Sequence, residues 1–290
     1  MSDNNENQII SGWKYYNHAM IPTCEPHEIP NLKPLQSGTL LKNRDVWGGG
    51  KDRPLFARWT EDYDCGYETT FWYCIKDDIF DISALKSKRR YEIKKGLKNF
   101  DVKVIDPFQY SEQLYDVAVM AFSAYPEAYR PKIEKRAFIN GIDEWTITGS
   151  TVFGAFDKES GRLCGYAQLI KQARAINFNI EKTIPEFESK GVNAAICMAI
   201  VLYYQKEIEK GYYIVDGARA ISHETHFQDY LEKYFGFRRA YCHLHVKYKW
   251  WVLLAVKALY PFRTMIEKSK SSLAHNITGV LRMEEWKVRE

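Results

Sequence analysis

The sequence has little excess charge of either sign. Its 290 residues include 41 Lys and Arg and 37 Asp and Glu, which leaves a formal net charge of +4. Proteins that bind nucleic acid through their overall charge carry a larger basic excess. Any binding of that kind would therefore depend on a local cluster of basic residues.

Cysteine patterns typical of metal sites are also missing. The six cysteines are spread over the whole length, without a C-x-x-C pair or the paired histidine spacing of a zinc site. We therefore expect a reduced, intracellular protein that needs no metal.

Long apolar runs are absent as well. The longest run, residues 250–259, is interrupted by Lys257 and is far shorter than the ~20 residues of a membrane-spanning helix. The first residues, MSDNNENQIISG, are polar and acidic, unlike a secretory signal. The sequence thus predicts a cytoplasmic protein without a transmembrane segment.

The N-terminal part of the chain is expected to be an extension of mixed character. Proline and glycine in residues 1–57 predict mostly irregular structure, and residues 55–59 and 69–75 read as the strands of a hairpin. A helix over residues 82–100 follows, with an apolar side. Its basic side is a stripe at i, i+4 spacing formed by Lys86, Arg90, Lys94 and Lys98.

From residue 101 onward, signals for strands and helices alternate, and the chain is predicted to have three parts: an extension (1–100), a domain (101–248) and a helical tail (249–290). Periodicity in the domain predicts the order β-α-α-β-β-β-α-β-α-β. The strands are expected at residues 101–105, 151–156, 163–170, 175–181, 212–215 and 240–248. The helices are expected from residue 111, at 133–145, at 193–209 and at 226–235.

This order resembles the fold of the GNAT acyltransferases. The segment YLEKYFGF, a Tyr-bearing helix end with a Gly-Phe pair before the last strand, is similar to the closing motif of that family. SKRRYEIKKGLKNF and IVDGARAISHETHFQDYLEKYFGF resemble the Fem-type aminoacyltransferase branch. The resemblance implies an α/β (α+β) fold, a mixed sheet flanked by helices. It also implies that strands 175–181 and 212–215 are neighbours that splay apart to form the donor cleft.

The activity that the resemblance implies is acyl transfer, most simply from acetyl-CoA or another acyl-CoA to an amine on a small molecule, sugar or peptide. The segment before the helix expected at 193–209 departs from the pattern of GNAT enzymes that use acetyl-CoA. Between Glu188 and Ala195, only one of the two usual glycines is present. The donor could therefore differ from acetyl-CoA. A helix N-terminus attracts phosphate, and the predicted donor-binding residues are Lys190, Gly191, Val192 and Asn193. An ordinary helix start with Asn193 as N-cap is the alternative.

Polar residues alternate with apolar ones along strand 175–181, as Asn177, Asn179 and Glu181. Pointing inward, this row would line a wet cleft, in which Asn177 and Asn179 bind substrate and Glu181 acts as general base. An edge strand with one solvated face would explain the same pattern.

Asp216 follows the next buried strand, and ligands tend to bind at strand ends of open α/β sheets. We predict a catalytic role for Asp216, although Asp-Gly after a strand is also a common turn. The substrate-binding candidates beyond it are Arg219, His223 and His226. By resemblance, Tyr230 or Tyr234 of the last helix protonates the departing thiolate.

Two other functions stay open. A Fem-type transferase would take its acyl group from aminoacyl-tRNA, which the basic stripe could contact, and a catalytically silent GNAT-fold protein would only bind a ligand or RNA. The small net charge argues against tRNA. The sequence does not indicate an oligomeric state.

Overall fold

The computed structural model describes residues 11–38, 40, 54–125, 127, 130–221, 226–269 and 271–288. They form two compact units, each of which combines distant segments of the chain. Unit 1 comprises the described residues of Met1–Tyr73, Ala218–Thr225 and Arg239–Glu290, and unit 2 those of Cys74–Gly217 and His226–Arg238. The division into parts 1–100, 101–248 and 249–290 follows chain order rather than packing, and it stays a prediction.

Unit 2 is built on a mixed sheet. Strands β5 to β8 pair antiparallel in sequence order, whereas β9 pairs parallel with β8. The strands are β5 (Phe100–Ile105), β6 (Thr151–Asp157), β7 (Leu163–Gln172), β8 (Ala175–Thr183) and β9 (Tyr213–Ala218). The strand next to β9 on its other side is β4 (Phe71–Lys76).

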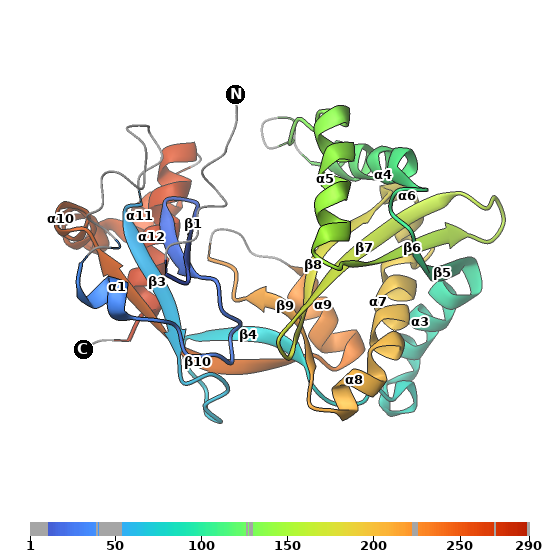
Figure 1. Cartoon of the computed structure of the whole chain (residues 1–290), viewed down its shortest axis with the longest axis horizontal. Helices are drawn as coiled ribbons and strands as arrows, with labels where there is room; N and C mark the ends of the chain where they lie inside the picture. Colours follow the sequence, from blue (N-terminus) through green and yellow to red (C-terminus); the bar gives the residue numbers. More distant parts are fainter. Residues whose placement is uncertain are drawn as a thin grey trace. The chain divides into compact units, whose positions relative to one another are not determined.

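Helices cover both faces of this sheet (Figure 1). Helices α4 (Ser111–Ser123) and α5 (Lys135–Ile147) lie on one face. On the other face, α7 (Val192–Tyr203) contacts β5, β6 and β7, and α3 (Ser87–Asn99) packs on α7. Because α7 lies between the sheet and α3, it is apolar almost all round, as buried helices are.

The order of elements confirms the predicted fold class, a GNAT-like mixed sheet flanked by helices. From β5 it runs β-α-α-β-β-β-α-β-α-β, with two additional short helices, α6 (Pro185–Glu188) and α8 (Gln205–Glu209), and ends with α9 (His226–Phe235) and β10 (Arg238–Tyr248). The helix expected at 193–209 is divided into α7 and α8 at Tyr204. Strand β9 continues to Ala218, so Asp216 lies in a strand rather than in a turn.

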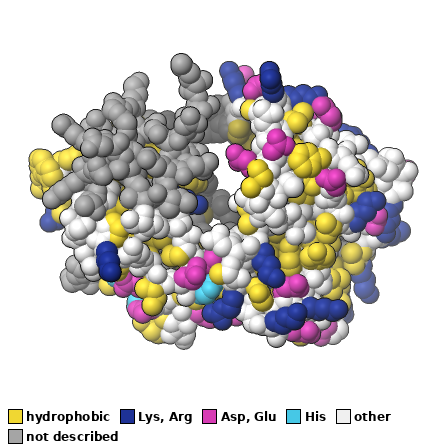
Figure 2. Space-filling model, in the orientation of Figure 1, with side chains coloured by type: hydrophobic (Ala, Val, Ile, Leu, Met, Phe, Trp, Pro, Cys, Tyr) yellow, Lys and Arg dark blue, Asp and Glu magenta, His cyan; other side chains and the backbone are white. Residues whose placement is uncertain are grey.

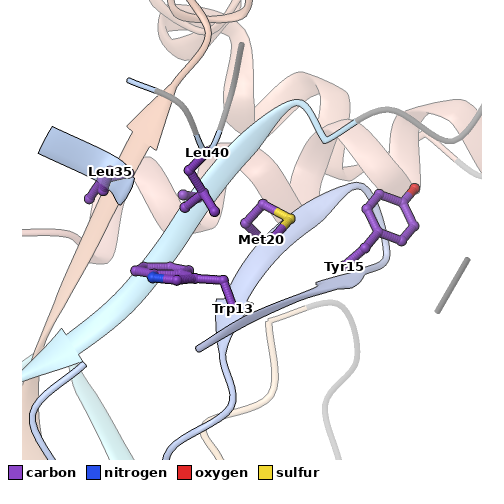
Figure 3. Close-up of a cluster of buried hydrophobic side chains, with 6 residues drawn as sticks. Trp13, Tyr15, Met20, Leu35 and Leu40 are labelled. Carbon is purple, nitrogen blue, oxygen red and sulfur yellow. The ribbon is translucent and has the colours of Figure 1, made fainter. Parts of the chain in front are cut away.

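Unit 1 has strands of its own. Strand β1 (Trp13–Tyr16) pairs antiparallel with β2 (Ala19–Pro22), β2 pairs parallel with β3 (Phe56–Glu61), and β3 pairs antiparallel with β10. Figure 3 shows the cluster of side chains, from Trp13 to Leu40, that β1, β2 and α1 (Lys33–Gln36) help to bury. The predicted C-terminal helical tail is present as α10 (Trp250–Leu259), α11 (Arg263–Glu267) and α12 (Ser272–Trp286).

The predicted hairpin of residues 55–59 and 69–75 is wrong in its pairing. Both strands exist, as β3 and β4, but β10 lies between them in the strand order. The N-terminal hairpin is instead β1 and β2, in a segment that was expected to be irregular. Its two turn residues, Asn17 and His18, both have positive φ, as the tight turns of hairpins require.

Helices α3 and α7 pack so closely that adding one methyl group between them should lower the stability of the protein. A Cβ atom at Gly96 would lie 2.4 Å from the carbonyl oxygen of Gly191, so Gly96→Ala requires the backbone to move. We expect this variant to lose about 1–3 kcal/mol in free energy of unfolding, measured by urea denaturation. Gly141→Ala is the matched control, because that helix position has open space and should gain about 0.5–1 kcal/mol. Equal stability of both variants would contradict this packing.

Candidate functional site

The neighbouring strands β8 and β9 pair over only part of their length. Three residue pairs connect them, the last being Asn177 and Val215, although β8 continues to Thr183 and β9 to Ala218. Beyond that pair the strands separate (Figure 1). The two strands are thus neighbours that splay apart, as predicted. Beyond Asn177 and Val215, their backbone N–H and C=O groups form no hydrogen bonds with each other.

Strand β8 contains a β-bulge in its middle. Gln168 of β7 lies opposite Ile180, and Leu169 lies opposite Phe178, so Asn179 is an extra residue in β8. Its side-chain amide donates a hydrogen bond to Oε1 of Gln168 at 3.0 Å. Bulges of this kind change the direction of side chains and are frequent next to active sites.

The bulge overturns the predicted row of polar side chains. In a regular strand, Asn177, Asn179 and Glu181 would share one face of the sheet. One extra residue reverses the alternation, so that Glu181 faces the same side as Ala167, and Asn177 the opposite side. The prediction of a single polar face was therefore wrong.

The carboxylate of Glu181 is buried without a partner. Both of its oxygens are inaccessible to solvent and accept no hydrogen bond from a described residue, even though other parts of the residue are partly exposed. Burial raises the pKa of Glu181 well above 4.5, and the charge of Asp216 raises it further. A buried polar group without a partner lowers stability, so Glu181 stands out as a functional candidate.

Asp216 of β9 is the second carboxyl group at this place. Burial raises the pKa of Asp216 from 3.8 to about 7, although a hydrogen bond from Gln228 of α9 favours the charged form. Because the charge of Asp216 disfavours a charge on Glu181, the second proton of the pair is harder to remove once Asp216 has lost its own. A carboxyl group with a pKa near 7 can accept and release a proton at neutral pH.

Two helices bring further groups to the carboxyls. Burial raises the pKa of the Cys197 thiol on α7, and the charges of Glu181 and Asp216 add to the effect. Burial also raises the pKa of Tyr230 on α9, and Cys197 and Glu181 contribute. We call Glu181, Asp216, Cys197 and Tyr230 the carboxyl cluster. The sequence analysis missed Cys197, because a cysteine in an apolar helix is ordinarily a small core residue.

Two more candidates lie on the same helices. Asn193 precedes Cys197 by four residues, hence on the same side of α7, and its Oδ1 atom is buried without a hydrogen bond from a described residue. Tyr234 lies one turn after Tyr230 on α9, with ring centroids 4.8 Å apart. Cys197 and Glu181 both contribute to the raised pKa of Tyr230, which places Tyr230 near these two groups.

The predicted donor-binding segment packs closely on its surroundings. Gly191 has a φ of +91° and occupies the cap position of α7, so the alternative of Asn193 as N-cap was wrong. Val192 is fully buried. The ammonium of Lys190 lies 3.9 Å from the carboxylate of Asp157. The role of this segment in binding phosphate stays a prediction.

The other predicted substrate-binding residues, Arg219, His223 and His226, are not members of the carboxyl cluster. His226 is exposed at the start of α9, and His223 lies outside the described residues. Arg219 belongs to unit 1, where its guanidinium donates to the carbonyl of Thr70 and lies 3.9 Å from the ring centroid of Trp286.

Over the described residues, no three His, Cys, Asp or Glu side chains are arranged to hold a metal ion. No helix in those ranges is long and apolar enough to span a membrane.

The basic stripe follows α3, but the side chain of Arg90 is bound within the protein. Arg90 donates to two preceding backbone carbonyls, whereas Lys86, Lys94 and Lys98 are exposed. On the face shown in Figure 2, basic and acidic side chains are interspersed. The stripe is therefore a line of three exposed lysines.

Comparison with known proteins gives similarity in structure only. The sequence matches no protein-family model and no curated protein. A conserved protein of unknown function from Bacteroides thetaiotaomicron is 12% identical with a TM-score of 0.51, and the match covers 83% of this chain and 84% of that one.

Two further solved structures show weaker similarity. FemX is 11% identical with a TM-score of 0.46, over 68% of this chain and 65% of its own. The PaiA N-acetyltransferase from Thermoplasma acidophilum, solved in complex with coenzyme A, is 20% identical with a TM-score of 0.29, over 38% of this chain and 72% of that one. At these identities it is the order and pairing of this chain's own elements that shows its GNAT-like fold.

Proposed function

We propose that this protein is an acyltransferase whose reaction takes place where β8 and β9 separate. The observation that supports it most is the buried carboxyl of Glu181, which has no hydrogen-bond partner among the described residues and lies close enough to Asp216 for the charge of Asp216 to raise its pKa. Perturbed pKa values of this kind are typical of functional sites. The GNAT-like order of elements supplies the reaction class by resemblance.

In the proposed reaction an amine attacks the carbonyl carbon of an acyl thioester. A C–N bond forms, the C–S bond breaks, and the nitrogen loses a proton. The Glu181 and Asp216 pair accepts that proton, since carboxyl groups with raised pKa values are effective bases near neutral pH. The simplest donor is acetyl-CoA, and the acceptor is an amine on a small molecule, sugar or peptide.

Tyr230 is assigned to the departing sulfur. Because burial raises the pKa of Tyr230 above that of a free phenol, the phenol holds its proton more firmly than a thiol does. It is therefore better suited to donating a hydrogen bond to the thiolate than to giving up its proton. The final proton of the thiol then comes from solvent or from the carboxyl pair.

The donor is proposed to bind between the separated strands. Backbone groups of β8 beyond Asn177 have no partner on β9, so they can bond to the amide groups of a pantetheine arm in the way that a strand is added to a sheet. The phosphates would then lie near the start of α7, at Lys190 to Asn193.

Binding of acyl-CoA is the direct test of this proposal. We expect acetyl-CoA at about 100 times its Kd to stabilise the protein by about 2.7 kcal/mol, which raises the melting temperature by several degrees. Differential scanning fluorimetry measures the shift, and ATP at equal ionic strength controls for binding through charge alone.

A protein that no acyl-CoA stabilises at millimolar concentration would contradict the proposed donor. The Fem-type alternative would then be tested with tRNA at two salt concentrations. Contacts of Lys86, Lys94 and Lys98 with phosphates would weaken steeply as salt rises. If neither ligand binds, the alternative left is a catalytically silent GNAT-fold protein that binds another ligand.

A further inference from the structure

Unit 1 contains a pocket that the proposed acyl transfer does not use. Its volume is about 450 Å³, and it is lined by the turn between β1 and β2, by β3, by the residues that follow β9 and by α12. Pockets of this size hold small organic ligands. Two arginines, Arg58 and Arg219, are among the residues that line it.

Arg58 is a cation on an apolar face. It lies opposite Val246 of β10 and two residues after Phe56, so it shares a face of β3 with a buried apolar cluster that includes Phe56 and Leu244. No described residue forms a hydrogen bond or an ion pair with it. Burial lowers the pKa of Arg58, and among the described residues only the hydroxyls of Tyr73 and Tyr16 oppose this effect.

An unpaired guanidinium in such surroundings destabilises the folded state, because the charge loses hydration without gaining a counterion. None of the described residues that line the pocket is acidic. The described lining of this pocket therefore supplies no counterion, whereas Glu25 and Glu28 line a second cavity that Arg58 also borders.

Arg219 adds to the positive charge of the pocket. Its guanidinium is held by neutral groups, the carbonyl of Thr70 and the ring of Trp286. Burial lowers the pKa of Arg219, the nearby charges of Arg239 and Arg282 lower it further, and the charge of Glu285 opposes this shift. An anion in the pocket would offset both the lost hydration of Arg219 and its repulsion by the neighbouring arginines.

We propose that this pocket binds a small organic anion. Its carboxylate or phosphate group is bound by Arg58 and Arg219, because planar guanidinium groups match the paired oxygens of both kinds of anion. Its apolar part lies against Phe56, Val280 and Met283, which line the same pocket. This inference does not depend on the acyl-transfer reaction.

The test uses three probes with the same six-carbon chain: hexanoate, hexyl phosphate and hexanamide. Isothermal titration of the full chain should show binding of at least one of the two anions, and hexanamide should bind at least about tenfold more weakly. The anion that binds more tightly identifies the carboxylate or the phosphate as the natural group. Absence of binding by both anions at about 10 mM overturns the proposal.

Arg58→Met should weaken binding of the anion at least about tenfold. Without ligand, the same variant should melt at a higher temperature than the wild type, because it replaces a partly buried charge that has no partner among the described residues by an apolar side chain of similar length. Lys257→Met is the matched control. It removes one positive charge from an exposed position of α10 in unit 1 and should change neither property. Unchanged binding by Arg58→Met, or a lower melting temperature, overturns the proposal.

Discussion

Glu181→Gln is expected to slow acyl transfer at least about 100-fold at neutral pH, because glutamine keeps the shape of the side chain but cannot accept the proton of the attacking amine. The loss should appear in kcat, and the KM for acyl-CoA should change little, since the carboxylate acts on the nitrogen rather than on the donor. The measurement is release of free thiol from acetyl-CoA across a panel of amines.

The loss of activity in this variant should not come from unfolding. Replacing a buried, unpaired carboxyl by a neutral amide removes the cost of ionising it, so Glu181→Gln should be at least as stable as the wild type near pH 8. Glu186→Gln is the control, because that side chain is exposed on α6 and, among the described residues, forms only a surface ion pair with Arg162. If Glu181→Gln keeps full activity, the carboxyl is not the base.

The fold was largely predictable because most of its signals are local. The apolar character of α7 and the strand patterns of β6 to β8 are set by neighbours in sequence, and turns such as the one that includes Gly161 separate them. The position of β10 was not predictable in this way. Its partner β3 lies more than 170 residues earlier, and local periodicity carries no information about pairing at that distance.

The candidate site shows the same limit at the scale of single residues. Glu181 and Asp216 could be singled out from local sequence, because Glu181 continues a row of polar residues along a strand and Asp216 directly follows a buried strand. The bulge at Asn179 could not be predicted from the sequence, because an extra residue in a strand is recognised only from its register against the neighbouring strand, here β7. Arg58 was missed for a related reason. Its charge is unusual only once the apolar cluster around it is known.

Asp216→Asn is expected to remove a fall in stability that the wild type shows as pH rises from about 4 to about 7. In the unfolded chain this carboxyl ionises near 3.8, whereas in the folded protein its pKa is about 7. Between these values the folded state holds a proton that the unfolded state has lost, so the free energy of unfolding decreases with rising pH. A shift of about three pKa units corresponds to at most about 4 kcal/mol.

Urea denaturation of the wild type and the variant at several pH values between 4 and 8 measures this effect. Glu181 titrates in the same direction and remains in Asp216→Asn, so a smaller decrease with pH should persist. Cys197 and Tyr230 have raised pKa values and stay neutral throughout this range. Asp101→Asn on β5 is the control, because that side chain is exposed. A variant whose stability follows the wild-type pH curve would show that Asp216 does not hold its proton in the folded state, and the proposed proton-accepting pair would then reduce to Glu181 alone.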